Sequence, residues 1–156
     1  MANVMRWRYG DTNPVMAPAD SSLIEVGDLV ALSSGSAVSA GTFANLGSEP
    51  ANQEAFHDSF LGVAMQQSPE GETQSIRVAT SGVFEFLSAS ATYGIGDLLG
   101  THEPVSGAEL YNQSIATVLS PSLAIGRCVR SQPQAAAKVL VDVVSTVVRG
   151  GPQAAA

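Results

Sequence analysis

Residues 81–100, SGVFEFLSASATYGIGDLLG, carry the clearest structural signal in the chain. An alternating apolar run leads through small residues to a Gly-Asp turn and then to a second apolar run. Because a period of two is typical of a half-buried β-strand, this stretch predicts a strand–turn–strand unit. The residues expected in or beside the core are Val83, Phe84, Phe86, Ile95, Leu98 and Leu99.

The same pattern continues along most of the chain. Short runs such as SLIEVGDLVALSS, TQSIRVATSGVFEFL and AKVLVDVVSTVV are separated by clusters of Gly, Pro, Ser and Asn. This spacing favours a mainly β fold, a compact antiparallel β-barrel or sandwich. Short strands and a long loop are expected over 35–59, where residues 52–60 could form two helical turns. QPQAAAKVL (132–140) is a second helix candidate, but its Val-rich continuation favours a strand.

Two pairs of weak motifs point to an internal duplication. EVGDLVAL (25–32) resembles GIGDLLGT (94–101), and FLGVAM (60–65) resembles AIGRCV (124–129). The pairs follow the same order, 69 residues apart at the aspartates and 64 apart at the glycines. Because Gly-Asp turns are common, two unrelated turns fit the motifs as well. In either case both halves are expected to build a single β domain over 23–148.

The two ends of the chain are expected to lie outside that domain. Residues 1–22 are predicted to form an extended N-terminal arm, because Pro14 and Pro18 exclude a continuous helix. Aromatic anchors on this arm could dock on a neighbouring protein, or the single tryptophan could pack back on its own domain. The tail RGGPQAAA (149–156) is predicted to be flexible. The candidate contact residues of the arm are Arg6, Trp7, Arg8 and Tyr9.

Composition excludes several classes of partner. Only 13% of the residues are charged, the formal net charge is −7, and Lys and Arg together number seven. Because binding to phosphate backbones requires clustered Lys and Arg, no nucleic-acid partner is expected. The chain shows no secretion signal and no apolar run of membrane-spanning length, so we expect a soluble protein made in a cytoplasm-like compartment. Low charge suits a protein packed against other proteins, although an Ala/Gly/Ser-rich coding bias explains it equally well.

Residues suited to nucleophilic or metal chemistry are scarce. His57 and His102 are the only histidines, and neither a Ser nucleophile motif nor close metal-ligand spacing accompanies them. Cys128 is the only cysteine; it lies in an apolar alternation and is expected to be a small buried hydrophobic residue. No catalytic residue, metal site or cofactor site is therefore predicted.

Neither the acidic pairs nor the motif similar to carrier proteins predicts a catalytic or carrier function. Pairs of carboxylates can hydrolyse glycosidic bonds, but those of this chain fit solvated turns better. Phosphate-binding glycine loops are absent from the sequence. The VGDLVAL turn is similar to that of biotinyl and lipoyl carrier barrels, whose modified lysine sits at a hairpin tip, whereas Lys138 opens a Val-rich strand. The chain is thus predicted not to be an enzyme; the carboxylates considered were Glu70, Glu72, Glu85 and Asp97.

The ordering of the β motifs resembles a family of small bacteriophage head-decoration, or capsid cement, proteins that are encoded beside the major capsid protein. SIRVATSGVFEFLSASATYGIGDLLG (75–100) matches their strand of the form V-A-x-x-G-V-F-E, followed by small residues, Gly-Asp and an apolar pair. GDLV at 27–30, GVA at 62–64 and IG at 125–126 complete the pattern. The resemblance covers about residues 22–148 and rests on the order of weak motifs.

The resemblance implies a virion structural protein on the outer surface of an icosahedral phage head. Such proteins are β-rich and commonly trimeric, and they stabilise contacts between capsomers. The implied partners are the major capsid protein and further copies of the chain itself, with the N-terminal arm adding a strand to the capsid protein. The 35–59 loop and the C-terminal tail depart from the family pattern. The alternative is a head-fibre or receptor-binding module that displays a sugar-binding face.

Overall fold

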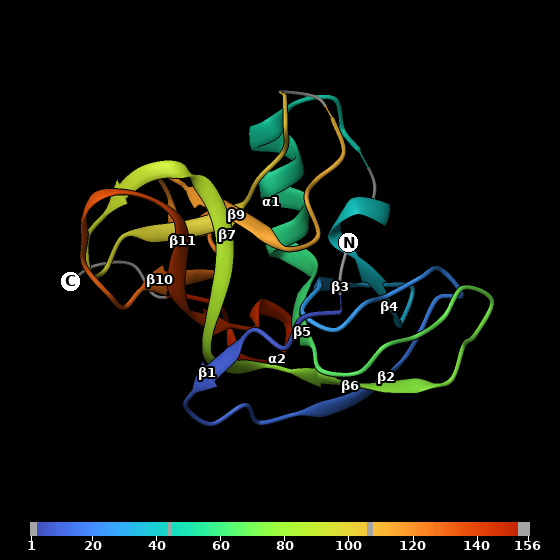
Figure 1. Ribbon diagram of the computed structural model, residues 1–156. Coiled ribbons are helices and arrows are strands. Elements are labelled where there is room, and N and C mark those ends of the chain that lie inside the picture. Colours follow the sequence, from blue (N-terminus) through green and yellow to red (C-terminus); the bar gives the residue numbers. More distant parts are fainter. Residues whose placement is uncertain (1–2, 44, 106–107, 153–156) are drawn as a thin grey trace.

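The computed structural model describes residues 3–43, 45–105 and 108–152, and they form a mainly β structure (Figure 1). The first half builds a five-stranded sheet, here called the N-terminal sheet, in the order β2-β6-β5-β3-β4. The second half builds five strands in the order β7-β11-β10-β8-β9. Because β7 also pairs with β9, these five strands close into a barrel, the C-terminal barrel. The predicted β-barrel class is confirmed.

The elements have the following bounds. The strands are β1 (Trp7–Tyr9), β2 (Val15–Pro18), β3 (Leu29–Ser33), β4 (Ser36–Ser39), β5 (Phe60–Ala64), β6 (Ser75–Ala79), β7 (Ser81–Tyr93), β8 (Leu98–Thr101), β9 (Ser114–Thr117), β10 (Gly126–Cys128) and β11 (Gln132–Val144). The helices are α1 (Glu49–Ser59) and α2 (Thr146–Arg149), with 3-10 turns at Ala40–Thr42 and Pro121–Leu123.

The two halves repeat one topology. Replacing β2, β3, β4, β5 and β6 by β7, β8, β9, β10 and β11 converts the strand order of the N-terminal sheet into that of the barrel. The ends of the N-terminal sheet meet through one parallel bridge, Ala19 with Ala37, where the barrel has its parallel β7–β9 pairing. The duplication suggested by the motifs is therefore present in the topology.

The duplicated turns also agree in their hydrogen bonds. The Gly27 N–H donates to the Ala64 carbonyl at 2.8 Å, and the Gly96 N–H donates to the Cys128 carbonyl at 2.8 Å. Both glycines have left-handed backbone, with φ of 96° and 93°, which explains why this position of each Gly-Asp turn is glycine. The weak sequence motifs thus mark turns that have the same hydrogen bond and the same left-handed glycine in both halves.

The apolar core spans both halves. One cluster fills the barrel and continues into the layer between the barrel and the N-terminal sheet; a second, smaller cluster fills the N-terminal sheet. Phe84 and Phe86 are fully buried, with ring centroids 6.1 Å apart. Val83 and Leu99 are buried and Leu98 is half-buried, as predicted. Ile95 is 72% exposed, so its prediction is wrong; it lies in the turn before β8, where alternation no longer applies.

The short strand expected in the 35–59 region is confirmed, but the long loop predicted there is wrong. The region contains β4, a 3-10 turn and α1, which stands above the junction of the two halves in Figure 1. The helix begins after Ser48, whose hydroxyl accepts the Ala51 N–H, with Pro50 in its first turn. It confirms the helix expected at 52–60, with a start three residues earlier. Residues 132–140 belong to β11 and not to a helix.

The predicted ends of the domain shift as well. Residues 146–149 form α2, and Gly151 and Pro152 are buried, so the chain remains packed beyond the start of the predicted tail; residues 153–156 lie outside the described residues. At the N-terminus, β2 pairs with β6 and β1 pairs with β7. The segment is extended as predicted, but its strands belong to the domain's own sheets. The expectation that this segment lies outside the domain is therefore wrong; no local pattern shows the pairing, because the partner strands lie far along the chain.

Candidate docking surface

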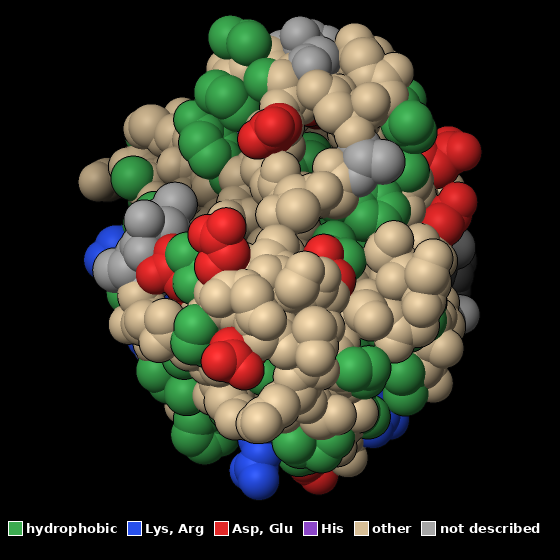
Figure 2. All heavy atoms as spheres, turned by 90° about the vertical axis from the view of Figure 1, so that its right-hand side faces the viewer, with side chains coloured by type: hydrophobic (Ala, Val, Ile, Leu, Met, Phe, Trp, Pro, Cys, Tyr) green, Lys and Arg blue, Asp and Glu red, His purple; other side chains and the backbone are tan. Residues whose placement is uncertain are grey.

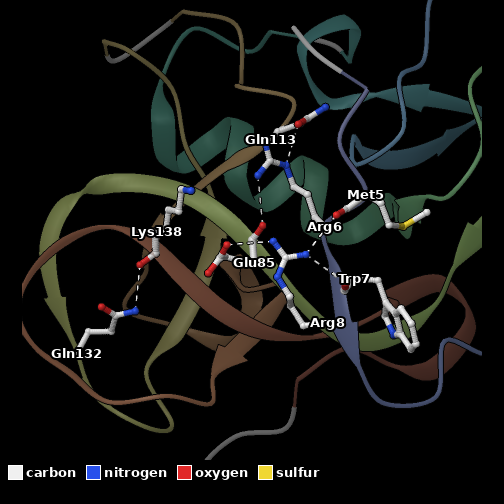
Figure 3. Close-up of polar contacts among 8 residues, drawn as sticks. All are labelled: Met5, Arg6, Trp7, Arg8, Glu85, Gln113, Gln132 and Lys138. Carbon is white, nitrogen blue, oxygen red and sulfur yellow. Dashed lines mark hydrogen bonds and ion pairs between the residues drawn. The ribbon is translucent and has the colours of Figure 1, made fainter.

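The strand β1 presents an exposed apolar stripe, here called the β1 stripe, made by Met5, Trp7 and Tyr9. Their exposed fractions are 46%, 40% and 53%. Figure 3 shows Met5 and Trp7 projecting from one side of β1, and Tyr9 follows after a shift in the register of β1 on β7. The Trp7 indole donates from Nε1 to the Gly10 carbonyl at 3.0 Å, which holds the ring over the turn that follows. The stripe is therefore apolar, exposed and fixed in place.

Arg6 anchors β1 from the opposite face. Its side chain is buried, and its Nε donates to Gln113 Oε1 at 2.8 Å (Figure 3). Gln113 in turn donates to Asp28 Oδ1 at 2.9 Å, and Ser39 donates to Asp28 Oδ2 at 2.7 Å. Burial lowers the pKa of the Arg6 guanidinium, with the nearby Arg8 acting in the same direction and Glu85 opposing. Arg6 was one of the candidate contact residues of the arm, but its side chain is held inside the molecule and cannot reach a partner.

Arg8 covers the outer edge of β1. Its guanidinium donates to the carbonyls of Met5 and Trp7, each at 3.2 Å, and pairs with Glu85 Oε1 at 3.1 Å. The register of β1 on β7 also shifts between Trp7 and Tyr9, which is a β-bulge. A bulge and a cationic side chain are two devices that protect an edge strand from pairing with other chains. Docking by strand addition is thus disfavoured, and docking through the side chains of the stripe is favoured.

The segment after β1 is fixed to the junction between the two halves. Thr80 donates its N–H to the Thr12 carbonyl at 2.9 Å and its hydroxyl to the Asn13 carbonyl at 2.6 Å. The Ser81 hydroxyl donates to the Asp11 carbonyl at 2.7 Å. Because β6 ends and β7 begins here, residues 3–18 act as a strap that contacts both the barrel and the N-terminal sheet.

The residues considered for catalysis are not brought together. His57 Nδ1 lies 2.7 Å from the Ala124 carbonyl, and His102 Nδ1 lies 3.4 Å from Glu49 Oε2. Asp97 Oδ2 accepts the Gly94 N–H at 2.9 Å, a turn role, while Glu85 pairs with Arg8 and does not face Asp97 in any contact of the described residues. Glu70 and Glu72 are exposed in a turn, as expected.

Cys128 is buried, as predicted, and its thiol donates to the Arg130 carbonyl at 3.1 Å. Burial raises the pKa of this thiol, which disfavours the reactive thiolate. Among the described residues, no group of three or more His, Cys, Asp or Glu side chains could hold a metal ion. The helices of the described ranges are all too short or too polar to cross a membrane.

The surface is poor in charge, as the composition implied. Figure 2 shows one face, over the N-terminal sheet, on which acidic side chains are scattered and a few basic ones lie near the margin. No protein-family model, no curated protein and no solved structure matches the chain.

The anchoring network was not predictable from sequence. Arg6 and Gln113 are 107 residues apart, and Gln113 and Asp28 are 85 apart, so neither pair has a local pattern. The β1 stripe did have a local sequence pattern, because Met5, Trp7 and Tyr9 are apolar residues at every second position. The candidate site is therefore an exposed apolar stripe on a strand that is anchored within the molecule.

Proposed function

We propose that the chain is a capsid decoration protein that binds the outer surface of an icosahedral phage head and stabilises contacts between capsomers. The observation that carries the proposal is the β1 stripe, an exposed apolar row on a strand anchored by Arg6 and Arg8. Contiguous exposed apolar side chains often mark a protein–protein contact. The resemblance of residues 22–148 to head-decoration proteins supports the identity of that partner, the major capsid protein.

The energetics fit a weak contact made many times. Burying one large apolar side chain stabilises an interface by roughly 1.5–3 kcal/mol before the cost of association is subtracted. Three such side chains give a modest contact in one copy. A homotrimer seated between capsomers would repeat it with avidity, which is the arrangement that we propose. Because Arg6 and Arg8 are engaged within the domain, electrostatic attraction contributes little to the contact.

Point variants test this better than truncation. Removing residues 2–13 would delete β1 and the Arg6 anchor together, so a loss of binding would not separate docking from folding. Trp7→Ala should leave the protein folded, with a loss of about 1–3 kcal/mol in the free energy of unfolding because the ring is partly covered and bonded to Gly10, and it should weaken co-sedimentation with empty shells measurably. The matched control is Ile95→Ala, which removes an exposed apolar side chain elsewhere. Unchanged binding of Trp7→Ala to shells would refute the role of the stripe.

A head-fibre or receptor-binding module is the second candidate. The specific observation in its favour is that Trp7 and Tyr9 are two exposed aromatic side chains on one strand, as in many surfaces that stack on ligands. Imaging of the particle distinguishes a decoration protein from a fibre module by where the copies lie. Copies spread over the shell support decoration, and copies confined to the tail or to a vertex spike support the fibre.

A further inference from the structure

Each half of the duplication carries an addition that the other half lacks. The β4–β5 connection contains α1, whereas the equivalent β9–β10 connection holds only a 3-10 turn. Conversely, β7 and β11 have 13 residues each, whereas their counterparts β2 and β6 have 4 and 5. Figure 1 shows α1 above the junction of the halves and the orange segment that enters β11 at the left-hand side of the barrel. Insertions that distinguish one repeat from another often lie on the binding face.

The outer side of α1, here called the acidic face, consists of residues that recur every three or four positions and therefore share one side of the helix. A hollow of about 700 Å³ lies between this face and the 3-10 turn at Pro121–Leu123. No Lys or Arg is among the described residues that line the hollow. The acidic face thus combines small apolar side chains with two carboxylates; its residues are Pro50, Ala51, Glu54, Ala55 and Asp58.

The two carboxylates of the acidic face are unfavourable for the helix that carries them. Glu54 and Asp58 are exposed, and neither carboxylate has a hydrogen bond or an ion pair within the described structure. They lie four positions apart, where like charges repel each other. Asp58 also lies in the last turn of α1, at the negative end of the helix dipole. A cation from outside the molecule would relieve both effects.

The segment 130–138, here called the basic segment, presents the opposite charge. Arg130 and Lys138 are exposed, and neither charged group is paired with any described residue. The Gln132 side chain donates from Nε2 to the Lys138 carbonyl at 3.2 Å, which holds the two ends of the segment near each other. Figure 3 shows the Lys138 side chain extending away from this contact. The segment therefore offers two free cations from one part of the barrel.

Free cations are scarce elsewhere on the molecule. The chain has seven basic residues. Arg6 and Arg8 are engaged in anchoring β1, while Arg127 donates to a backbone carbonyl at 2.6 Å and Arg149 to a threonine hydroxyl at 3.0 Å. Arg77, on the N-terminal sheet, is the third exposed cation without a partner among the described residues. The basic segment thus holds two of the three cations that remain for an intermolecular contact.

The acidic face and the basic segment match in side-chain size as well as in charge. Ala51 and Ala55 lie between the acids on α1, and residues 135–137 are three alanines between the bases. Small side chains on both sides let two backbones approach closely. Within the described part of one copy, no hydrogen bond or ion pair joins the two surfaces, and Figure 1 shows them on different sides of the molecule. Their complementarity can therefore be satisfied only between copies.

We propose that the acidic face of one copy binds the basic segment of a second copy. Because the two surfaces differ, the contact is head-to-tail, and head-to-tail contacts give a closed ring when the rotation closes. Charge complementarity would fix the orientation of the copies, and the alanines would pack at the centre. A ring of three rests on the homotrimer of the proposed function, whereas the contact itself does not depend on the capsid.

The test measures self-association of the full-length protein at micromolar concentration by light scattering and sedimentation velocity. The parent should form an oligomer. Glu54→Lys with Asp58→Lys should raise its dissociation constant by about tenfold or more, and Arg130→Glu with Lys138→Glu should do the same. A variant with all four substitutions exchanges the charges of the two surfaces and should regain the oligomer. This recovery separates the contact from misfolding, because two further substitutions do not rescue a misfolded chain.

Matched controls carry the same charge changes elsewhere. Glu70→Lys with Glu72→Lys reverses two exposed acids of a turn, and Arg77→Glu reverses the remaining free base. Neither control variant should change the dissociation constant by more than about twofold. Raising the salt concentration should weaken the parent oligomer, because screening reduces the attraction between exposed charges.

Three results would overturn the proposal: a monomeric parent, a four-substitution variant that associates no better than the two-substitution variants, or controls that weaken association equally. A dimer that responds to the same reversals would keep the contact and contradict the ring of three. All of these variants retain the β1 stripe. A parent oligomer that shows the charge-exchange recovery but does not co-sediment with shells would therefore contradict decoration and leave the contact standing.

Discussion

Asp28 and Asp97 occupy the same place in two copies of one turn. Asp28 Oδ2 accepts the Glu25 N–H at 3.0 Å, and Asp97 Oδ2 accepts the Gly94 N–H at 2.9 Å. Their surroundings differ, since Asp28 is 1% exposed and also accepts hydrogen bonds from Ser39 and Gln113. Duplication therefore preserved the turn, while one copy was drawn into the network that holds the N-terminal strap.

This difference predicts unequal effects of the same substitution. Asp28→Ala should lower the free energy of unfolding by about 3 kcal/mol, because it leaves the buried Ser39 and Gln113 groups without their acceptor. Asp97→Ala removes a turn hydrogen bond at a half-buried site and should cost about 1 kcal/mol. Urea unfolding of both variants measures this. Equal losses would show that the buried network adds nothing to the turn.

The stacked phenylalanines predict a loss of core stability. Phe84→Ala or Phe86→Ala should each lower the free energy of unfolding by about 3–5 kcal/mol, because the rings are fully buried in the cluster that joins the two halves. Insoluble or unfolded protein is the extreme form of the same result. Ile95→Ala is the control and should change stability by less than about 0.5 kcal/mol. If either phenylalanine variant melts like the parent, the strand register described above is wrong.

Equivalent glycines in the two halves predict equivalent steric effects. A Cβ at Gly62 would collide with the Ala79 carbonyl oxygen, and a Cβ at Gly126 would collide with that of Asp142. Gly62→Ala and Gly126→Ala should each destabilise the protein by about 1–3 kcal/mol or more. Gly94→Ala, where the nearest neighbouring atom would be 3.7 Å away, should be tolerated. Thermal unfolding compares the three, and tolerance at Gly62 or Gly126 would contradict the close strand approach.

Burial of Cys128 predicts a protected thiol. Burial raises its pKa above the ordinary value of 9.0, so the thiolate is scarce in the folded protein at neutral pH. Alkylation by iodoacetamide should be slower than in the urea-unfolded chain, on the order of a hundredfold. As the pH rises above 9.0 the unfolded chain ionises first, so the contribution of this group to stability is present below that pH and is lost above it. Equal alkylation rates in the two states would contradict the buried position.

Short-range sequence patterns predicted individual strands, their buried faces and the repeated turns. The alternation around Phe84 and Phe86 gave the strand and its buried face, and two Gly-Asp motifs indicated the duplication. The start of α1 was also readable, since Ser48 followed by Pro50 is a helix N-terminal signal. Ile95 was misplaced because a turn interrupts alternation without changing the apolar character of the residue.

Long-range pairings account for what the sequence did not reveal. Prolines showed that the N-terminal segment is extended, but its partners β7 and β6 lie far along the chain, and nothing local identifies them. The same holds for Arg6 with Gln113 and for His102 with Glu49. The exposed aromatics Trp7 and Tyr9 were identified from their residue type and their place in a proline-containing extended segment, although Arg8 between them is exposed as well.

The proposed decoration of a phage head is tested most directly by cryo-EM of phage heads mixed with the purified protein. The proposal predicts copies on the outer surface of the shell between capsomers, with the β1 stripe against the major capsid protein. Light scattering of the purified protein should give a trimer in solution, or trimers should be visible on the shell. Density confined to the tail or a vertex spike, or shells without any copy, would contradict the decoration proposal.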